Sequence, residues 1–312
     1  SPGAQPPPGV TRRALHRATG IPRRWGRGAS VGGVQPASGL GDRAGQRGVD
    51  GERRRDLVDV EPVLDREGHR EDQLGGAGSH DDATHDGTAA LLRDLFPDVT
   101  AHFQRFTVRE ISMRDEALAQ FDPVPLLEAA GLLNDARMDV IAWSGTSASW
   151  LGFETDRRLC AAITEATGVP ATTSVLALNE VLARTGVTRL GLVTPYLDDI
   201  QAAIVANYAA EGVEVVAERH LGDRGNFSFS EYDETTLAGL VREAAKDEPE
   251  AIAILCTNLR GAGIVSSLEQ EIGIPIYDSV SVTVWKSLTL AGVSPARITD
   301  WGKLFQDPRL GA

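Results

Sequence analysis

The chain has 312 residues, enough for two domains of ordinary size or one large one, and its 42% hydrophobic content is normal for a globular protein. No apolar run approaches the roughly 18 residues that a membrane-spanning helix needs, so we expect no membrane partner. The formal net charge of −13 argues against binding to nucleic acid, because attraction to phosphates needs clustered basic residues.

Cysteine and histidine usage narrows the possible sites. Only two cysteines occur, Cys160 and Cys256, which excludes a disulfide framework and favours a reducing compartment. The N-terminal residues also lack a basic-then-apolar signal pattern, so we predict a cytoplasmic protein. The six histidines are scattered without metal-ligand spacing, so we expect no metal site.

The N-terminal part differs in charge from the rest. Residues 1–70 carry 13 Arg and 8 acidic residues, whereas the remainder carries 18 basic and 36 acidic residues. Residues 1–55 show no helical or strand period, and such a Gly-, Pro- and Arg-rich segment cannot bury enough apolar surface to fold. We therefore expect residues 1–80 to be a disordered or non-native tail. Two alternatives stay open for this segment. It could be an Arg-rich arm that binds RNA, or its residues could come from GC-rich DNA translated upstream of the true start or in a shifted frame.

Periodic structure begins near residue 87 and then alternates between helices and strands. In chain order the patterns predict a helix over 87–95, a strand over 101–108, a helix over 123–136, a strand over 138–144, helices over 155–167 and 174–185, a strand over 188–194, a helix over 198–210, a strand over 213–219, a helix over 233–245, a strand over 251–256, a helix over 262–272, a strand over 274–277 and a helix over 279–291. Strands that alternate with helices of this length predict parallel sheets.

The element order suggests a duplication. Residues 139–185 and 251–291 share the order strand, polar turn, helix, short strand and helix, and each short strand follows a Gly-x-Pro, at 168–170 and 273–275. Chance similarity between two ordinary βαβ units is the alternative. If the halves are related, the two polar turns face each other across a cleft.

These polar turns are the candidate site. Gly145, Thr146 and Ser147 follow the strand 138–144, and Cys256 ends the strand 251–256. Ligands of open α/β sheets bind at the carboxyl ends of the strands. We therefore expect one thiol to face an oxyanion-binding loop.

Four motifs resemble the aspartate/glutamate racemase superfamily, in particular its arylmalonate decarboxylase and maleate isomerase branch. They are Gly145-Thr146-Ser147, the run from Thr194 to Asp199, the run from Cys256 to Arg260, and the segment from Ser279 to Gly292 with Trp285. The resemblance covers roughly residues 80–305. It implies two α/β domains related by a pseudo-twofold axis, with the site at their interface and neither cofactor nor metal. The domains would be 81–175, completed by 279–305, and 176–278.

The resemblance also implies a chemistry. Racemases of the group use two cysteines, one on each face of a carbon acid, and Gly145 stands at the first of these positions, as in arylmalonate decarboxylases. The leading hypothesis is a decarboxylase of a small dicarboxylate, in which Cys256 protonates an enediolate. Gly145 would let the substrate approach the backbone. Oxyanion and substrate contacts are expected from Thr146, Ser147, Tyr196, Thr257 and Asn258.

Several alternatives stay open. In a maleate-isomerase-like enzyme Cys256 would attack an alkene as a thiolate, and a racemase-family protein or a non-catalytic small-acid binding protein are further possibilities. Cys256 could be a buried apolar residue, and Arg260 could bind a carboxylate or neutralise a surface acid. The sequence gives no indication of the oligomeric state.

One part of the family pattern is missing from the sequence. A first strand and its substrate-binding loop should precede residue 88, yet 73–80 is a poor strand and 82–86 only faintly matches the loop. We also expect 223–234 to form a mobile loop near the site.

Overall fold

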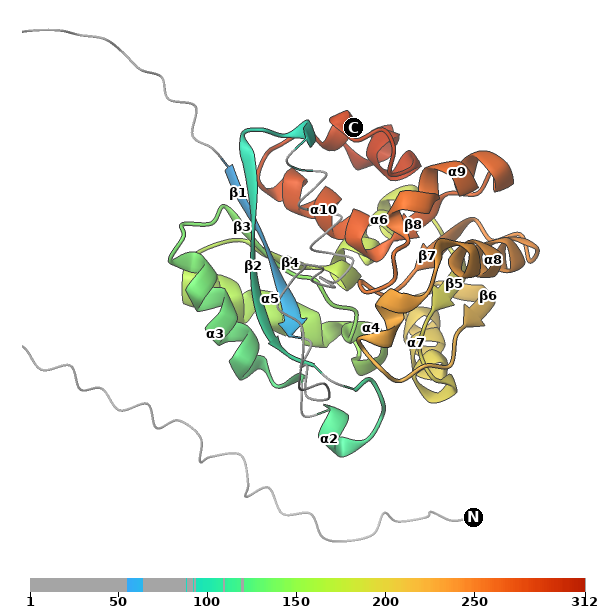
Figure 1. The fold of residues 1–312 in the computed structure, drawn as a ribbon, viewed down its shortest axis with the longest axis horizontal. Helices are drawn as coiled ribbons and strands as arrows, with labels where there is room; N and C mark the ends of the chain where they lie inside the picture. The colour runs from blue at the N-terminus through green and yellow to red at the C-terminus, as the bar shows by residue number, and fades with distance from the viewer. Residues whose placement is uncertain are drawn as a thin grey trace, which may run out of the picture. The chain divides into compact units, whose positions relative to one another are not determined.

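A computed structural model describes residues 55–63, 88, 92, 94–108, 110–118 and 121–311. Two four-stranded parallel sheets organise residues 51–312 (Figure 1). The first has the order β2-β1-β3-β4, with β1 Arg55–Val63, β2 Val99–Thr107, β3 Val140–Trp143 and β4 Ala171–Thr173. The second has the order β6-β5-β7-β8, with β5 Arg189–Thr194, β6 Glu214–His220, β7 Ala251–Ile254 and β8 Ile276–Asp278.

Both sheets have the same internal order, in which the first strand of each half lies between the second and the third. All strand pairs of the two sheets are parallel. This repetition confirms the prediction of two similar parallel α/β units. The polar turns that follow β3 and β7 therefore occupy equivalent places at the carboxyl ends of the two sheets.

The helices agree closely with the sequence pattern. They are α2 Asp115–Leu118, α3 Pro123–Asn134, α4 Ala148–Leu151, α5 Phe153–Thr167, α6 Ser174–Thr185, α7 Asp198–Ala210, α8 Glu234–Ala245, α9 Ala262–Ile272 and α10 Ser279–Leu290. Short α2 and α4 are the two without a predicted counterpart. The Gly-x-Pro signals end α5 and α9, because Gly168 and Gly273 take the left-handed conformation (φ 75° and 78°) that a helix C-terminus favours.

Strand β1 corrects the expectation that residues 1–80 stay outside the fold. It pairs with β2 from Arg55↔Val99 to Val63↔Thr107, and its other edge pairs with β3 at Leu57↔Val140. The missing first strand is therefore supplied by 55–63. This strand was not predicted because its sequence contains acidic and basic residues and is not the continuous apolar run that indicates a buried strand. The segments 73–80 and 82–86 lie outside the described residues, and the domain boundaries stay predictions.

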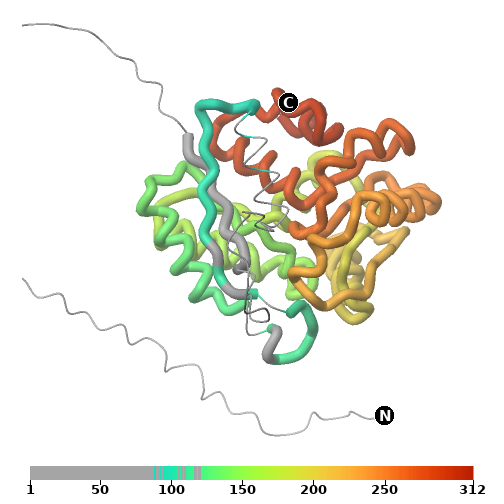
Figure 2. The backbone as a smooth tube through the Cα atoms, viewed as in Figure 1, coloured from blue at the N-terminus to red at the C-terminus, as the bar shows by residue number. Residues whose placement is uncertain are grey.

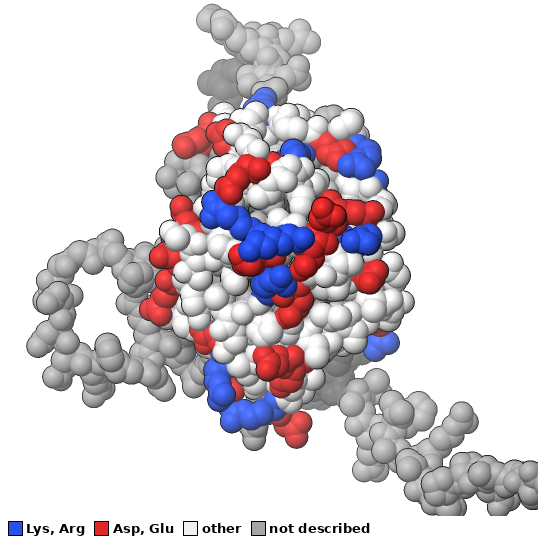
Figure 3. Space-filling model, turned by 90° about the vertical axis from the view of Figure 1, so that its right-hand side faces the viewer, with Lys and Arg blue, Asp and Glu red and all other residues white. Residues whose placement is uncertain are grey.

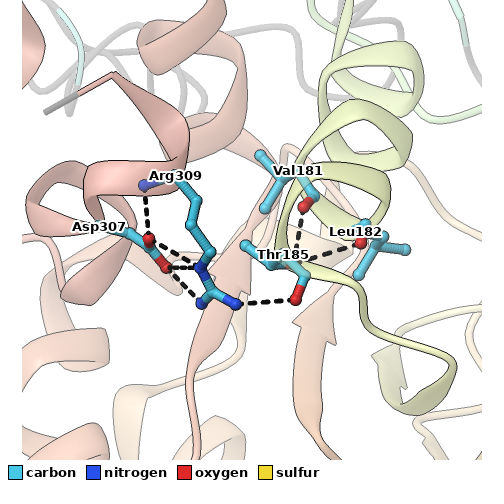
Figure 4. Close-up of polar contacts among 5 residues, drawn as sticks. All are labelled: Val181, Leu182, Thr185, Asp307 and Arg309. Atoms are coloured by element: carbon cyan, nitrogen blue, oxygen red, sulfur yellow. Dashed lines mark hydrogen bonds and ion pairs between the residues drawn. The ribbon is translucent and has the colours of Figure 1, made fainter.

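The C-terminal segment returns to the first half of the chain (Figure 2). Helix α10 packs against α6, β3 and β4, and Arg297 donates a hydrogen bond to the Leu95 carbonyl (3.3 Å). Figure 4 shows how the end of the chain is fixed to α6: Arg309 Nη1 donates to the Thr185 carbonyl (2.8 Å), while its Nε and Nη2 hold the carboxylate of Asp307 (3.0 and 2.6 Å). A guanidinium at a helix C-terminus satisfies a carbonyl that the helix leaves unpaired.

The outer surface of the second half carries both signs of charge. Figure 3 shows Lys and Arg side chains interspersed with Asp and Glu on the face where α8 and α9 lie. Arg242 Nε on α8 pairs with Glu271 Oε1 on α9 (2.7 Å), and Arg219 Nη2 on β6 pairs with Asp247 Oδ2 after α8 (2.9 Å). This mixed face lacks the clustered basic charge that binds nucleic acid. None of the helices within the described residues is long and apolar enough to cross a membrane.

Candidate active site

Two hydrogen bonds join the polar turn after β3 to the second half of the chain. The hydroxyls of Thr146, after β3, and Tyr196, after β5, lie 2.6 Å apart in the interior. From the turn after β7, Thr257 Oγ1 donates to the carbonyl of Ser144 (3.3 Å). The structure therefore brings the predicted residues of both halves together, and a substrate there would contact both sheets.

Cys256 lies at the centre of this junction and is 3% exposed. Burial raises the pKa of its thiol to about 11, although the Tyr196 hydroxyl and the backbone N–H groups of Asn258 and Leu259 hydrogen-bond the sulfur and oppose that rise. Nearby Asp278 raises the thiol pKa further. At neutral pH Cys256 therefore carries its proton, which makes it a proton donor rather than a ready-made thiolate.

Tyr196 connects the thiol to the Thr146 turn. Its hydroxyl contacts both Thr146 and Cys256, and burial raises the pKa of the phenol well above its usual value. Two aromatic side chains fix the ring edge-to-face, Trp150 at 5.0 Å and Phe229 at 5.7 Å between centroids. A phenol that stays protonated in a dry, rigid setting is a preorganised hydrogen-bond donor.

Gly145 has a different neighbour from the one we expected. A Cβ built on it would lie 2.1 Å from Cζ2 of Trp143, so the indole fills the space where a side chain would stand. The sequence suggested that the substrate approaches the backbone here. Instead, the glycine is required by the packing of Trp143, and a cysteine at 145 has no room unless the indole moves.

A second polar chain runs from the Cys256 turn to the end of the first sheet. Asn258 Nδ2 donates to the backbone carbonyl and to Oδ1 of Asn226 (3.0 and 3.1 Å), and Asn226 Nδ2 donates to the Val108 carbonyl (3.4 Å). Asn226 and Phe229 are both buried. The segment 223–234, expected to be mobile, is instead tied to both halves and includes a 3-10 helix over Ser228–Glu231. Asn226 was not predicted as a site residue, because a lone asparagine in a loop gives no periodic signal.

Ser147, Arg260 and Cys160 lie outside this hydrogen-bonded network. Ser147 is buried beside Trp143 and lines a largely apolar cavity of about 320 Å³ between α3 and α5. Arg260 Nε donates to the Ser230 carbonyl (3.3 Å), and its side chain is exposed.

Cys160, on α5, lies away from the turns, and burial together with Asp156 raises the pKa of its thiol to about 12. Within the described part of the chain, no three His, Cys, Asp or Glu side chains form a group that could hold a metal ion.

The family described as arylmalonate decarboxylase matches residues 94–305, which include both polar turns. The chain belongs to the arylmalonate decarboxylase family. This confirms the resemblance drawn from the four motifs.

Relatives and solved structures agree with this assignment. An arylmalonate decarboxylase of Bordetella bronchiseptica is 31% identical over 171 residues, which cover 54% of this chain and 71% of that protein. A maleate isomerase of Pseudomonas putida is 25% identical over 203 residues, which cover 63% of this chain and 80% of that protein. The structure of an unliganded arylmalonate decarboxylase superposes with a TM-score of 0.63 at 24% identity, covering 81% of this chain and 99% of that one. The fold is therefore shared along nearly the whole length of the solved family member.

Proposed function

We propose that this chain is a cofactor-independent decarboxylase of a small, arylmalonate-type dicarboxylate, with Cys256 as its single proton donor. The observation that carries the proposal is the buried thiol of Cys256, which is hydrogen-bonded to Tyr196 at the junction of the two sheets; its burial raises the thiol pKa and so favours the protonated form. Family membership and the related decarboxylase of Bordetella bronchiseptica support the reaction class.

The first step breaks the bond between the α-carbon and one carboxylate. Carbon dioxide leaves, and the electron pair stays on the α-carbon as an enediolate with the remaining carboxylate. Hydrogen-bond donors aimed at this charge are usually the largest catalytic contribution, and removal of one typically costs about 2.7–4 kcal/mol. We assign this oxyanion role to the hydroxyls of Thr146 and Tyr196, with Ser147, Thr257 and Asn258 as further substrate contacts.

The second step forms a C–H bond. The Cys256 S–H bond breaks, its proton goes to the α-carbon, and the thiolate later regains a proton from solvent. A single thiol on one face delivers the proton to that face alone, so the product of a prochiral malonate is expected to be one enantiomer. Gly145 offers no second thiol for the other face.

A maleate-isomerase-like reaction is the second candidate, supported by the Pseudomonas putida relative. That role requires Cys256 to attack as a thiolate, whereas burial disfavours the thiolate here. A non-catalytic small-acid binding protein remains a third outcome of the test. We place the protein in the cytoplasm on the strength of its cysteine usage; both cysteines are free.

The test is a direct comparison of substrates. Purified protein is incubated with phenylmalonate and, separately, with maleate, while carbon dioxide and fumarate are measured. We expect carbon dioxide from phenylmalonate, loss of that activity in Cys256→Ala and normal activity in Cys160→Ala, which removes the other thiol. Fumarate from maleate would favour the isomerase, and full decarboxylase activity in Cys256→Ala would disprove the mechanism.

A further inference from the structure

The carboxyl group of Asp278 is only partly explained by the fold. Asp278 ends β8 and is fully buried, and its Oδ1 caps α10 by accepting from the backbone N–H groups of Val280 and Ser281 (2.9 and 3.1 Å). Its other oxygen, Oδ2, has no hydrogen-bond partner in the part of the chain that the structure describes. An unpaired, buried carboxyl oxygen is costly, so a structural cap alone does not account for it.

The free oxygen faces the loop that carries Cys256. Asp278 is in register with Ile254, the last residue of β7, and the loop from Cys256 to Gly261 follows directly. A Cβ on Gly261 would lie 2.5 Å from Asp278 Oδ2 and 3.0 Å from Ile254 Cδ1. The loop therefore closes over both side chains, and the charge of Asp278 acts on the Cys256 thiol.

The neighbouring charged groups do not neutralise this carboxyl. On α9, Glu269 accepts hydrogen bonds from the backbone of Ile276 and Lys303, and Glu271 pairs with Arg242. The nearby lysines also have other partners: Lys286 on α10 pairs with Glu180, and Lys303 Nζ donates to the Gly273 carbonyl. The titratable group that directly contacts the Cys256 thiol is the phenol of Tyr196. Asp278 is thus the acidic neighbour of the thiol, and no described cation is paired with it.

We propose that Asp278 is a positioning residue for the catalytic proton: its unpaired carboxyl oxygen lies beneath the Cys256 loop, and the ionised carboxylate opposes formation of the Cys256 thiolate. The inference rests on the proposed function for its role in turnover. When the S–H bond breaks and the α-carbon gains the proton, a thiolate stands beside a second negative charge. That repulsion favours proton uptake from solvent, which re-forms the S–H bond for the next cycle.

The thiol can be titrated without turnover. The ultraviolet absorbance of the Cys256 thiolate is measured against pH in wild type, Asp278→Asn and Asp278→Ser. For each of the three, the absorbance of the same protein carrying the additional change Cys256→Ala is subtracted. Both substitutions retain a side chain that caps a helix, so α10 keeps its N-terminal acceptor. Removal of the like charge should lower the midpoint by about one pH unit, the lower end of the shift that a neighbouring charge causes.

A matched control separates charge from burial. Asp156→Asn neutralises another deeply buried carboxyl, on α5, and should leave the Cys256 midpoint unchanged. Thermal unfolding of each variant checks that it is folded. If Asp278→Asn does not fold, the midpoint of Asp278→Ser is compared with that of wild type instead. Midpoints that coincide in wild type and the folded Asp278 variants would overturn the inference.

The decarboxylase assay keeps the two proposals distinguishable. If wild type releases carbon dioxide from phenylmalonate, the alkaline limb of its kcat/KM profile should move to lower pH in Asp278→Asn. If the midpoint shifts but phenylmalonate is not consumed, the proposed function fails while Asp278 still controls the thiol. If phenylmalonate is consumed and the midpoint does not shift, the inference on Asp278 fails alone.

Discussion

The indole of Trp143 lies directly against Gly145, so that a Cβ on residue 145 would stand 2.1 Å from the Trp143 ring. This contact gives a physical reason why the first polar turn carries no thiol. The tryptophan is 2% exposed and packs against Phe106 with centroids 5.0 Å apart, so its ring has little room to move. A cysteine at residue 145 would therefore require the Trp143 indole to move, so packing disfavours a second thiol there.

Gly145→Cys should destabilise the protein by about 1–3 kcal/mol, because it overpacks a buried site. The double variant Trp143→Leu, Gly145→Cys should be more stable than the sum of the two single changes predicts, since each change relieves the other. Urea unfolding measures all three free energies. Gly131→Cys is the matched control, because a Cβ at residue 131 would meet no other atom within 4 Å, and it should cost little. Strict additivity in the double variant would contradict the packing argument.

Tyr196→Phe should lower kcat by about 10²–10³, because it removes a donor proposed to stabilise the enediolate. It also removes a hydrogen bond that lowers the Cys256 pKa, so the thiol should titrate at higher pH than in wild type. Steady-state kinetics and the thiolate titration measure the two effects. The control is Tyr208→Phe, which removes the hydroxyl of another buried tyrosine, one on α7 outside the site. Equal losses in the two variants would argue against a catalytic role for Tyr196.

Asp156 should make the protein less stable as pH rises from about 4 to 7. Burial raises the pKa of its carboxyl to about 7, while an unfolded aspartate titrates near 3.9. In that window the unfolded chain has released a proton that the folded chain keeps, so ionisation favours unfolding. Asp156→Asn should remove a part of the slope no larger than about 1.4 kcal/mol per pH unit, measured by urea unfolding at several pH values.

A second buried carboxyl contributes to that slope. Some slope should remain in Asp156→Asn, because burial raises the pKa of Asp278 to about 7 as well. A variant at 156 with the full wild-type slope would show that its carboxyl is not held protonated in the folded state.

Asn226→Ala should raise KM and cost about 1 kcal/mol of stability, because it breaks the hydrogen bond to the Val108 carbonyl and one of two acceptors for Asn258. Kinetics and urea unfolding measure the change. Phe227→Ala is the control, since it removes a larger but 37% exposed side chain from the same loop and should change KM little. If both variants behave alike, the loop acts only as a surface segment.

The sequence alone predicted most of the second half and the chemistry of its turn. Strand β7 is a continuous buried run, and the helices α6 and α7 have the predicted bounds, because strong local signals coincide with tertiary packing there. It also named Cys256 and Thr146, from the polar turns after apolar strands, and Tyr196, from the family resemblance, as candidate site residues. In the structure the Tyr196 hydroxyl contacts both other side chains, and the catalytic roles of the three stay predictions. The sequence failed at β1, where the strand carries charged residues and is specified by its two neighbours rather than by its own composition.

Long-range contacts decided the rest. Asn226 joins Val108 to Asn258 across more than a hundred residues of sequence, and Asp278 leaves one oxygen free beneath the Cys256 loop. Trp143 and Gly145 are close in the chain, but the indole that fills the space beside Gly145 packs against Phe106 on another strand. The thiol pKa likewise follows from burial and from partners on other elements, not from its flanking residues. Sequence patterns record the preferences of local backbone and faces, whereas the protonation state of a buried group is set by the surroundings that folding assembles.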